Sequence, residues 1–225
     1  MMATIELKNV NRTFGTGIGQ VQALSAINFQ AQAGELTLIL GPSGSGKSTF
    51  LTIAGGLRKP SSGQVLIDGQ DIQNLNNHEL ERLRLNKIGF ILQSYNLLPY
   101  LTVAEQFQLV DRVKPNGNLN REELDQLMRE LDIIQLKSQY PDQLSGGQNQ
   151  RVAIARALYT NPSLVLADEP TAALDSERGA AVGQEFQRLA RQKNKTVIVV
   201  THDLRLRKYA DRIFEINDGK IKQTK

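Results

Sequence analysis

A glycine-rich segment between an apolar run and a helix-compatible stretch most strongly limits what this chain can fold into. The segment reads Gly-Pro-Ser-Gly-Ser-Gly-Lys-Ser-Thr over residues 41–49, after the apolar run 36–40 and before the stretch 50–57. The order strand, G-x-x-x-x-G-K-[ST], helix is that of a phosphate-binding loop. A Gly/Ser-rich turn with an incidental lysine is the alternative, and the flanking strand and helix argue against it. The segment therefore predicts a nucleoside triphosphate site at a strand-to-helix junction.

Each residue type in this loop has a chemical task. The glycines allow backbone conformations that side chains forbid, so successive N–H groups can turn toward a phosphate chain. The helix that follows adds its N-terminal N–H groups and the positive end of its dipole. The Lys47 ammonium would meet the outer phosphates, and the Ser48 hydroxyl would bind Mg²⁺. We expect nucleotide contacts from Gly41, Pro42, Ser43, Gly44, Ser45, Gly46, Lys47, Ser48 and Thr49.

A second group of motifs lies in the second half of the chain. The segment Leu144–Gln148 reads Leu-Ser-Gly-Gly-Gln, and further on the apolar run Leu164–Ala167 ends in Asp168 and Glu169. An acid at the carboxyl end of a buried parallel strand lies at the ligand crevice of the sheet. Asp168 is therefore well placed to hold Mg²⁺, partly through water. By itself an Asp-Glu pair reads equally well as a turn or helix cap, and the phosphate-binding loop favours the metal site.

The order of these motifs resembles the ATP-binding cassette of ABC proteins, over about residues 4–220. By this resemblance Leu144–Gln148 is the signature motif and Leu164–Asp168 is the Walker B strand. Glu169 is then the catalytic acid that polarises the attacking water, and Asp175 belongs to the D-loop. The resemblance implies ATP hydrolysis, with ATP and Mg²⁺ as cofactors.

Three further side chains take roles from the same resemblance, and each has a plainer interpretation. Gln93 follows an apolar strand and resembles the Q-loop glutamine, although a glutamine at a strand end says nothing by itself. His202 resembles the switch histidine that donates to the γ-phosphate, whereas a lone histidine is more often packed or on the surface. Phe14 resembles the adenine-stacking aromatic; the family more often has tyrosine there, but stacking needs only a flat ring. We therefore predict a catalytic group of Lys47, Glu169 and His202, and a Mg²⁺ site of Ser48, Gln93 and Asp168.

The signature motif predicts an assembly. Ser145, Gly146, Gly147 and Gln148 would open a helix and form a second anion site with little side-chain bulk, while the chain has one evident nucleotide pocket. The resemblance implies a head-to-tail homodimer in the ATP state, in which the signature of one cassette covers the ATP of the other. ATP then holds the dimer together and hydrolysis releases it.

Strand and helix patterns divide the single domain, residues 1–225, into two lobes. The core lobe, about residues 1–93 and 161–225, alternates strands and helices, which predicts a mainly parallel sheet covered on both faces. Its N-terminal strands are expected to be antiparallel, and Asp68-Gly69 marks a hairpin turn. The helical lobe, about residues 94–160, is inserted between the two parts. The fold class is α/β, and the resemblance implies the P-loop NTPase ABC cassette with a RecA-like core.

Composition and charge exclude some kinds of site and indicate how the protein could associate with a membrane. The chain has 225 residues, is 40% apolar and contains no cysteine, which excludes disulfides and thiolate metal sites. The net charge is +4, and its densest basic stretches, 205–208 and 220–225, are expected to be solvated helix faces and a frayed end. Attraction to nucleic acid or to an anionic membrane is the open alternative, and we expect no nucleic-acid partner. Because no apolar run approaches the ~20 residues that cross a bilayer, we expect membrane association through a partner only.

Three classes of ABC protein compete for this chain. Translation factors of the family carry two cassettes and a linker, and chromosome ATPases split the cassette around a long coiled coil. One cassette favours the motor of a transporter with a separate transmembrane permease, and a soluble non-transport ATPase remains the alternative. The segments 89–99, 101–105 and 166–175 resemble cassettes of macrolide-exporter, lipoprotein-release, haem-efflux and glycolipid-export type. This predicts a peripheral exporter subunit at the cytoplasmic face of the inner membrane, moving an amphipathic or hydrophobic substrate, with a periplasmic adaptor left open.

The segment Leu92–Thr102 directly follows the strand that leads to Gln93, so it could couple nucleotide state to a docked permease. Its apolar and aromatic side chains are either an interface or ordinary core of the helical lobe. They are Tyr95, Leu97, Leu98, Pro99 and Tyr100. The cargo site would lie in the permease, so the sequence does not choose the cargo.

Overall fold

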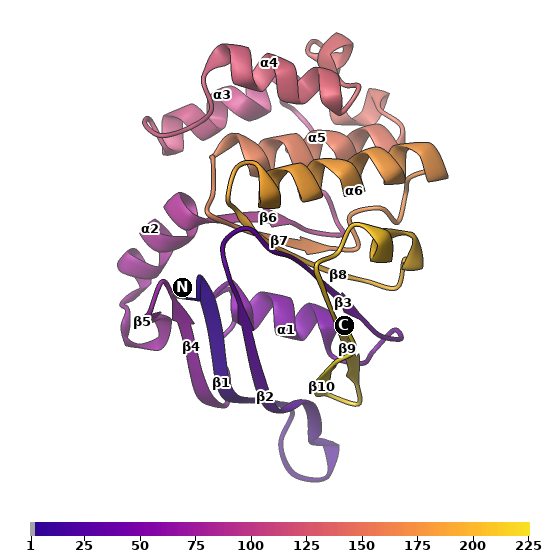
Figure 1. Ribbon diagram of the computed structural model, residues 1–225. Helices are drawn as coiled ribbons and strands as arrows, with labels where there is room; N and C mark the ends of the chain where they lie inside the picture. Colours follow the sequence, from indigo (N-terminus) through magenta and orange to yellow (C-terminus); the bar gives the residue numbers. More distant parts are fainter. Residues whose placement is uncertain (1–2) are drawn as a thin grey trace.

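The computed structural model describes residues 3–225, which form two β-sheets with helices between and above them (Figure 1). Residues 1 and 2 of the predicted core lobe lie outside the described residues. The helices that matter for the site are α1 Lys47–Ala54, α2 Asn77–Lys87, α3 Val103–Val113, α4 Arg121–Glu130, α5 Gly146–Tyr159 and α6 Ser176–Arg191.

The larger sheet has six strands in the order β10-β9-β3-β8-β7-β6. Their bounds are β3 Leu36–Leu40, β6 Ile88–Ile91, β7 Leu164–Asp168, β8 Thr196–Thr201, β9 Arg212–Asn217 and β10 Lys220–Gln223. Five of them run parallel, and β10 runs antiparallel to β9. In β8, Val197 and Val199 face one hydrophobic core while Ile198 and Val200 face another. An uninterrupted apolar strand is what a sheet covered on both faces requires, which confirms the predicted α/β architecture.

The smaller sheet is antiparallel, in the order β2-β1-β4-β5. Its strands are β1 Ile5–Phe14, β2 Val21–Ala31, β4 Ser62–Ile67 and β5 Gln70–Asp71, and the short 3₁₀ helix η1 Gly17–Gly19 lies in the projecting β1–β2 connection (Figure 1). Asp68 and Gly69 join β4 to β5 with φ angles of 50° and 79°. Two consecutive positive φ angles are those of a type I′ hairpin turn, so the hairpin predicted there is confirmed.

Helix α1 lies between the two sheets and fixes the end of the glycine-rich loop. Phe50 is fully buried and its ring meets that of Phe29 edge to face, with centroids 5.1 Å apart. The core around α1 draws side chains from both sheets, among them Leu7 of β1 and Leu166 of β7. The first turn of α1, directly after the loop, is therefore held by packing on both sides.

Helices α3 and α4 form the end of the molecule farthest from the smaller sheet, beyond α5 and α6 (Figure 1). Phe107 of α3 and Leu127 of α4 belong to the same core as the facing side of the larger sheet. Two 3₁₀ helices, η3 Ile134–Leu136 and η4 Pro141–Gln143, lie between α4 and α5. A third, η5 Leu204–Lys208, lies between β8 and β9. The helical insertion thus shares a core with the sheet, and its division into a separate lobe remains an interpretation.

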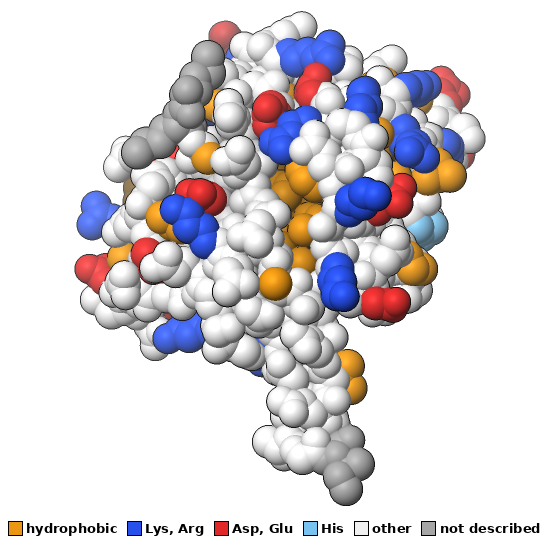
Figure 2. All heavy atoms as spheres, turned by 60° about the horizontal axis from the view of Figure 1, so that its bottom comes forward, with side chains coloured by type: hydrophobic (Ala, Val, Ile, Leu, Met, Phe, Trp, Pro, Cys, Tyr) orange, Lys and Arg blue, Asp and Glu red, His pale blue; other side chains and the backbone are white. Residues whose placement is uncertain are grey.

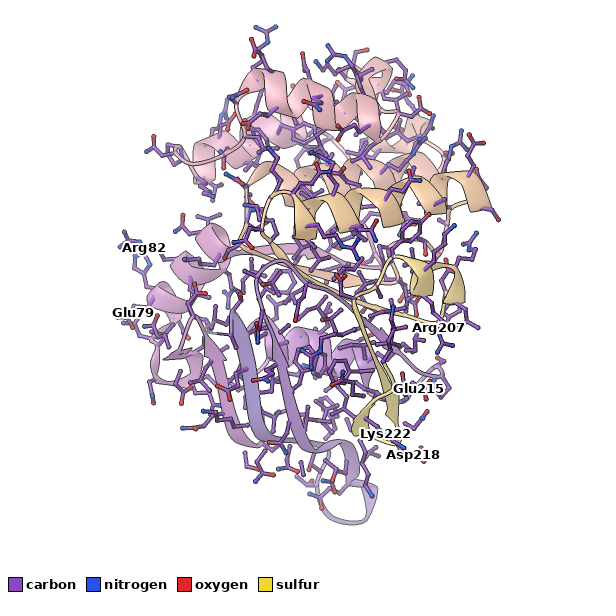
Figure 3. All side chains as sticks on the ribbon, in the orientation of Figure 1. Glu79, Arg82, Arg207, Glu215, Asp218 and Lys222 are labelled. Carbon is purple, nitrogen blue, oxygen red and sulfur yellow. The ribbon has the colours of Figure 1, made fainter. Side chains whose placement is uncertain are left out.

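The C-terminal tail pairs with the sheet instead of fraying, so the expectation of a frayed end is wrong. β10 lies beside β9 with Lys222 directly opposite Glu215, both labelled in Figure 3. Opposite charges facing each other across a strand pair contribute roughly 0.2–1 kcal/mol. The turn between the strands is Asp218-Gly219, and the Gly219 N–H donates to the carbonyl of Ser45 in the glycine-rich loop. The tail therefore supports the loop.

Charges on the face drawn in Figure 2 are mixed: Lys and Arg side chains lie among Asp and Glu side chains. This distribution agrees with the solvated surface expected from the scattered basic residues. Within residues 3–225, no helix has both the length and the apolar character that crossing a membrane would require.

Candidate functional site

A hollow of about 570 Å³ opens where the parallel strands β3, β6, β7 and β8 end. The loops that follow these strands converge there, as expected for the carboxyl edge of a parallel sheet. Its lining residues are Ala23, Ser43, Gly44, Gly46, Lys47, Ser48, Thr49, Gln93, Asp168, Glu169 and His202. The structure therefore brings together the predicted phosphate-loop, Q-loop, Walker B and switch side chains. Gly41, Pro42 and Ser45 belong to the same loop without lining the hollow.

The glycine-rich loop has the backbone that its sequence predicts. Gly44 and Gly46 have φ angles of 80° and 107°, a region that side-chain-bearing residues rarely adopt. A Cβ at Gly46 would lie 2.5 Å from the carbonyl oxygen of Ala23, so this position has no room for a side chain. Helix α1 begins at the next residue, Lys47. The unpaired N–H groups of the first turn of α1 therefore point toward the hollow. The buried hydroxyl of Ser45 has no hydrogen-bond partner among residues 3–225.

The Lys47 ammonium lies over the loop that it follows. Its side chain is buried, and Nζ donates to the carbonyl oxygens of Gly41 at 2.7 Å and Pro42 at 2.8 Å. A cation held among loop carbonyls at the floor of the hollow can turn to a phosphate oxygen, which is a stronger acceptor.

Asp168, at the end of β7, is a buried carboxylate with an unused oxygen. Its Oδ1 has no hydrogen-bond partner among the described residues. Burial raises the pKa of Asp168 above its ordinary value, and the neighbouring Ser48 hydroxyl offsets only part of this increase. A buried polar atom without a partner is costly unless something binds it.

The donor set around Asp168 fits Mg²⁺. Over residues 3–225, no group of three or more His, Cys, Asp or Glu side chains lies close enough to hold a metal ion. One carboxylate beside one hydroxyl suits Mg²⁺, which keeps several waters and completes its shell with phosphate oxygens. Gln93 is exposed at the rim of the same hollow, where its amide oxygen is available.

Glu169 is fixed by the end of the neighbouring strand. Its Oε2 accepts from the Thr201 hydroxyl at 2.6 Å, and its Oε1 accepts from the backbone N–H of His202 at 3.1 Å. His202 Nδ1 lies 2.9 Å from the same Oε1. Glu169 itself has a φ of 48°, so its backbone is in the left-handed region that favours glycine. The contacts hold a strained residue in one orientation at the edge of the hollow.

Sequence reasoning missed two residues that hold Glu169. Thr201 directly precedes His202 in the sequence. Because His202 was already predicted as the switch histidine, its neighbour Thr201 could have been predicted to lie at the site as well. Gln150 is 2% exposed on α5, and its side-chain amide donates to the Glu169 carbonyl at 2.9 Å. A glutamine just before the apolar stretch 152–155 was a weaker signal, because a helix pattern does not show which loop will meet it.

The predicted signature and D-loop residues lie at helix starts outside the hollow. Ser145 caps α5, and it exchanges hydrogen bonds with Gln148 in a capping box. Asp175 caps α6 and pairs with Arg178 at 3.0 Å. Gly146 is exposed, and Gly147 is partly buried. The structure of one chain therefore does not bring these residues to its own predicted nucleotide site, and their role stays a prediction.

Phe14 is the last residue of β1 and is also outside the lining of the hollow. The guanidinium carbons of Arg12 and Arg58 lie 4.7 Å and 5.0 Å from the centroid of its ring. Each guanidinium is attracted to the ring by a cation–π interaction. Stacking of adenine on Phe14 stays a prediction.

Comparison with known proteins gives the family. The sequence profile described as "ABC transporter" matches residues 24–172, more than half of the chain. The chain belongs to the ABC transporter family.

Individual relatives of this ABC cassette match along nearly its whole length. The "Putative hemin import ATP-binding protein HrtA" of Staphylococcus haemolyticus is 48% identical over 222 residues, which are 96% of this chain and 98% of the relative. The "Uncharacterized ABC transporter ATP-binding protein MJ0796" of Methanocaldococcus jannaschii is 44% identical over 97% of this chain and 95% of its own length.

Solved structures agree with the fold. The dimeric structure of MJ0796 superposes with a TM-score of 0.90 at 41% identity, covering 98% of this chain and 99% of that one. A second structure of MJ0796, also dimeric, is described as a post-hydrolysis state bound to ADP and Pi, with the same score and identity. The cassette described here is accordingly an ABC-type ATPase, the ATP-binding subunit of a transporter, and the predicted fold class is confirmed.

Proposed function

We propose that this cassette hydrolyses ATP with Glu169 as general base and uses the energy to drive a separate transmembrane permease. The observation that carries the proposal is the placement of Glu169. Its carboxylate is held by Thr201 and His202 at the edge of the hollow that contains the phosphate-binding loop. A fixed carboxylate beside a phosphate site can orient a water molecule for in-line attack and accept its proton.

The other side chains of the hollow would bind the phosphates and neutralise their negative charge. The Lys47 ammonium and the N-terminal N–H groups of α1 face the phosphates and stabilise negative charge that develops during transfer. His202 is exposed, with its ring beside Glu169, and would donate a hydrogen bond to the γ-phosphate. We assign Mg²⁺ to Ser48 and Asp168, with Gln93 contributing through water. When bound there, Mg²⁺ would neutralise part of the negative charge of the phosphates.

We propose that the active form is a head-to-tail dimer. Ser145 and Gly146 are exposed at the start of α5, and the α5 N-terminus supplies unpaired N–H groups suited to a phosphate. In a two-fold dimer each signature can cover the nucleotide of the other cassette, so both sites form together. The dimeric MJ0796 structures support this arrangement.

The dimer proposal is tested by sizing. Glu169→Gln keeps the shape of the side chain and removes the base, so the ATP-bound dimer should accumulate instead of being resolved by hydrolysis. Light scattering with Mg²⁺-ATP should show this variant as a dimer and show it as a monomer with ADP. A Lys47→Ala, Glu169→Gln double variant is the control that should stay monomeric. Monomeric Glu169→Gln at saturating ATP would contradict the head-to-tail dimer.

We further propose that the transporter is an exporter of an amphipathic or hydrophobic substrate, with the cassette peripheral at the cytoplasmic face of the membrane. The name of the HrtA relative connects that protein with hemin, a flat amphipathic molecule, although with import. The cassette should therefore be expressed with its permease and studied in inverted membrane vesicles. ATP-dependent accumulation of cargo inside such vesicles supports export, and ATP-dependent loss of preloaded cargo indicates import. Recovery of the cassette with ribosomes or DNA instead of membranes would contradict the transport role.

A further inference from the structure

One side chain connects the signature helix to the loop that carries the proposed base. The Gln150 amide nitrogen donates to the carbonyl oxygen of Glu169 at 2.9 Å, and its amide oxygen accepts from the N–H of Ala173 at 3.2 Å. A glutamine side chain is one of the few that can offer a donor and an acceptor together. Gln150 is 2% exposed, so water does not compete for either contact.

The surrounding packing makes this contact close. Gly147 lies one turn before Gln150 on the same face of α5, and a Cβ there would lie 3.1 Å from the carbonyl oxygen of Ala173. The absence of a side chain at Gly147 lets the loop 169–173 approach the helix backbone. The first turns of α5 and this loop therefore form one packed unit.

Gln150 binds the backbone of Glu169, which is in a strained conformation. Glu169 has a φ of 48°, and a non-glycine residue stays in that region only where neighbouring groups hold it. Its N–H donates to the Val200 carbonyl at 2.9 Å, and its carbonyl accepts from the Ala172 N–H at 3.2 Å. Those two contacts come from the sheet and from the loop itself, whereas Gln150 reaches the same carbonyl from α5. A shift of α5 would therefore pull directly on Glu169.

We propose that Gln150 is a positioning residue that links the two ATP sites of the dimer. It ties the backbone of Glu169, which acts at one site, to the signature helix, whose start covers the other site. Occupancy of the site under the signature would set the position of α5, and Gln150 would pass that position to the base. The proposal rests on the proposed role of Glu169 and on the head-to-tail dimer.

The alternative is that Gln150 only satisfies two buried backbone groups and stabilises the fold. Stability and catalysis separate the two explanations. A purely structural contact would change the melting temperature and leave the rate and the cooperativity of ATP hydrolysis as they are. A positioning contact would lower kcat and the Hill coefficient while ATP binding to the isolated chain stays the same.

The test uses the purified full-length chain and the substitution Gln150→Met, which keeps the length of the side chain and removes its amide. We expect kcat to fall about tenfold or more, because small displacements of a reacting group are costly. The Hill coefficient for ATP should fall toward that of independent sites, and the ATP dissociation constant should stay within about twofold of wild type. Gln150→Leu also removes both amide contacts, and its apolar side chain brings no charge into this buried position, so we expect a loss of kcat from it as well.

Gln187→Met is the matched control. Gln187 lies on α6, and its amide nitrogen donates to the carbonyl of Tyr209 at 3.1 Å, away from the hollow. This variant removes the same kind of contact, so it should lower the melting temperature without changing kcat or the Hill coefficient.

The outcomes are distinguishable. Wild-type kcat and cooperativity in Gln150→Met, or a wild-type chain without cooperativity, would overturn the proposal. If Gln150→Met does not fold, Gln150→Leu carries the same comparison. Glu169→Gln is measured in parallel. If it hydrolyses ATP at the wild-type rate, the proposed base is wrong. If it is inactive while the Gln150 variants turn over normally, only the link through Gln150 fails.

Discussion

The hydroxyl of Thr201 donates to Oε2 of Glu169 at 2.6 Å, while the backbone N–H of His202 donates to Oε1 at 3.1 Å and to Oε2 at 3.3 Å. Both carboxylate oxygens therefore have partners from one short segment at the end of β8. Hydrogen bonds to a charged group are roughly twice as strong as neutral ones, so this segment sets the direction of the side chain. The end of β8 therefore fixes the position of the proposed base, which directly follows the neighbouring strand β7.

The first prediction concerns this contact. Thr201→Val keeps the shape of the side chain and removes the donor, and we expect kcat for ATP hydrolysis to fall by about 10- to 100-fold, as for loss of a hydrogen bond to a charged group worth about 1.5–3 kcal/mol. Glu169→Gln, which removes the base itself, should lower kcat by about 10²- to 10⁴-fold. Steady-state ATPase assays and nucleotide titrations check both, and ATP affinity should be unchanged.

Thr196→Val is the control for Thr201. It makes the same substitution at the other end of β8, where the Thr196 hydroxyl donates to the hydroxyl of Thr4 at 2.8 Å. We expect a modest loss of stability and normal turnover. Equal kcat in Thr201→Val and wild type would show that the hydroxyl does not position the base.

The second prediction concerns the signature. Gly146→Asp should block the ATP-dependent dimer of the Glu169→Gln variant, because a carboxylate would face the γ-phosphate of the partner's nucleotide. The variant should fold, since the nearest atoms to a Cβ at Gly146 are the Tyr95 hydroxyl at 3.6 Å and the Ala173 Cβ at 3.9 Å. Light scattering measures the dimer, and a nucleotide titration should show unchanged ATP binding.

Ser138→Asp is the control, because it adds the same charge at an exposed position elsewhere in the helical insertion. It should dimerise normally. A Gly146→Asp protein that still dimerises would argue against contact between the signature and the partner's nucleotide.

The third prediction concerns pH. Burial raises the pKa of Asp203, but hydrogen bonds from Arg205 and Thr171 outweigh this and lower it from its ordinary value of 3.8 to about 2. The folded state therefore favours the carboxylate. This stabilisation is fully present above the ordinary pKa and is lost as pH falls through the folded value. The difference in unfolding free energy between wild type and Asp203→Asn should be largest above about pH 4 and should shrink toward pH 2.

Urea unfolding at a series of pH values measures this difference. Asp142→Asn, a substitution of an exposed acid in η4, serves as the control and should cost little at every pH. A constant difference for Asp203→Asn across the range would mean that the ion pair with Arg205 does not account for its contribution.

The elements with local signals could be predicted from the sequence. The glycine-rich loop needs left-handed glycines at fixed spacing, and Asp68-Gly69 needs two positive φ angles, so each is visible in a few adjacent residues. The pairing of β10 with β9 was not visible, because Lys220–Gln223 is polar and the hydrogen bonds of its partner decide its conformation. β1 also extends to Phe14, well past the apolar start of the strand, through irregular pairing with β2.

Some residues of the site could likewise be predicted from the sequence, and others could not. The residues that converge on the hollow lie directly after apolar strands, and parallel strands bring such positions together. Gln150 could not be assigned in this way, because its partners Glu169 and Ala173 are set by how α5 packs on a distant loop. Tertiary contacts of this kind leave no pattern in the residues next to them.

The last prediction concerns the docking of the permease on the segment after Gln93. Leu97 and Leu98 are poor probes, because Leu97 is partly buried against the main core and the backbone of Leu98 exchanges hydrogen bonds with the side chain of Gln106. Charge at either position would disturb the fold as well as any interface. Tyr100 is 70% exposed, and an exposed aromatic side chain is typical of a binding anchor.

Tyr100→Glu should therefore leave ATP hydrolysis by the isolated cassette and its melting temperature unchanged. The affinity of the cassette for membranes that contain the permease should fall about 30-fold or more, as for loss of an interface anchor worth at least about 2 kcal/mol. Val21→Glu is the matched control, since Val21 is 63% exposed on β2 of the smaller sheet, and it should bind membranes normally. Normal membrane recovery of Tyr100→Glu would place the permease elsewhere on the cassette. Equal loss for both variants would show that added negative charge, rather than the aromatic side chain, controls recruitment.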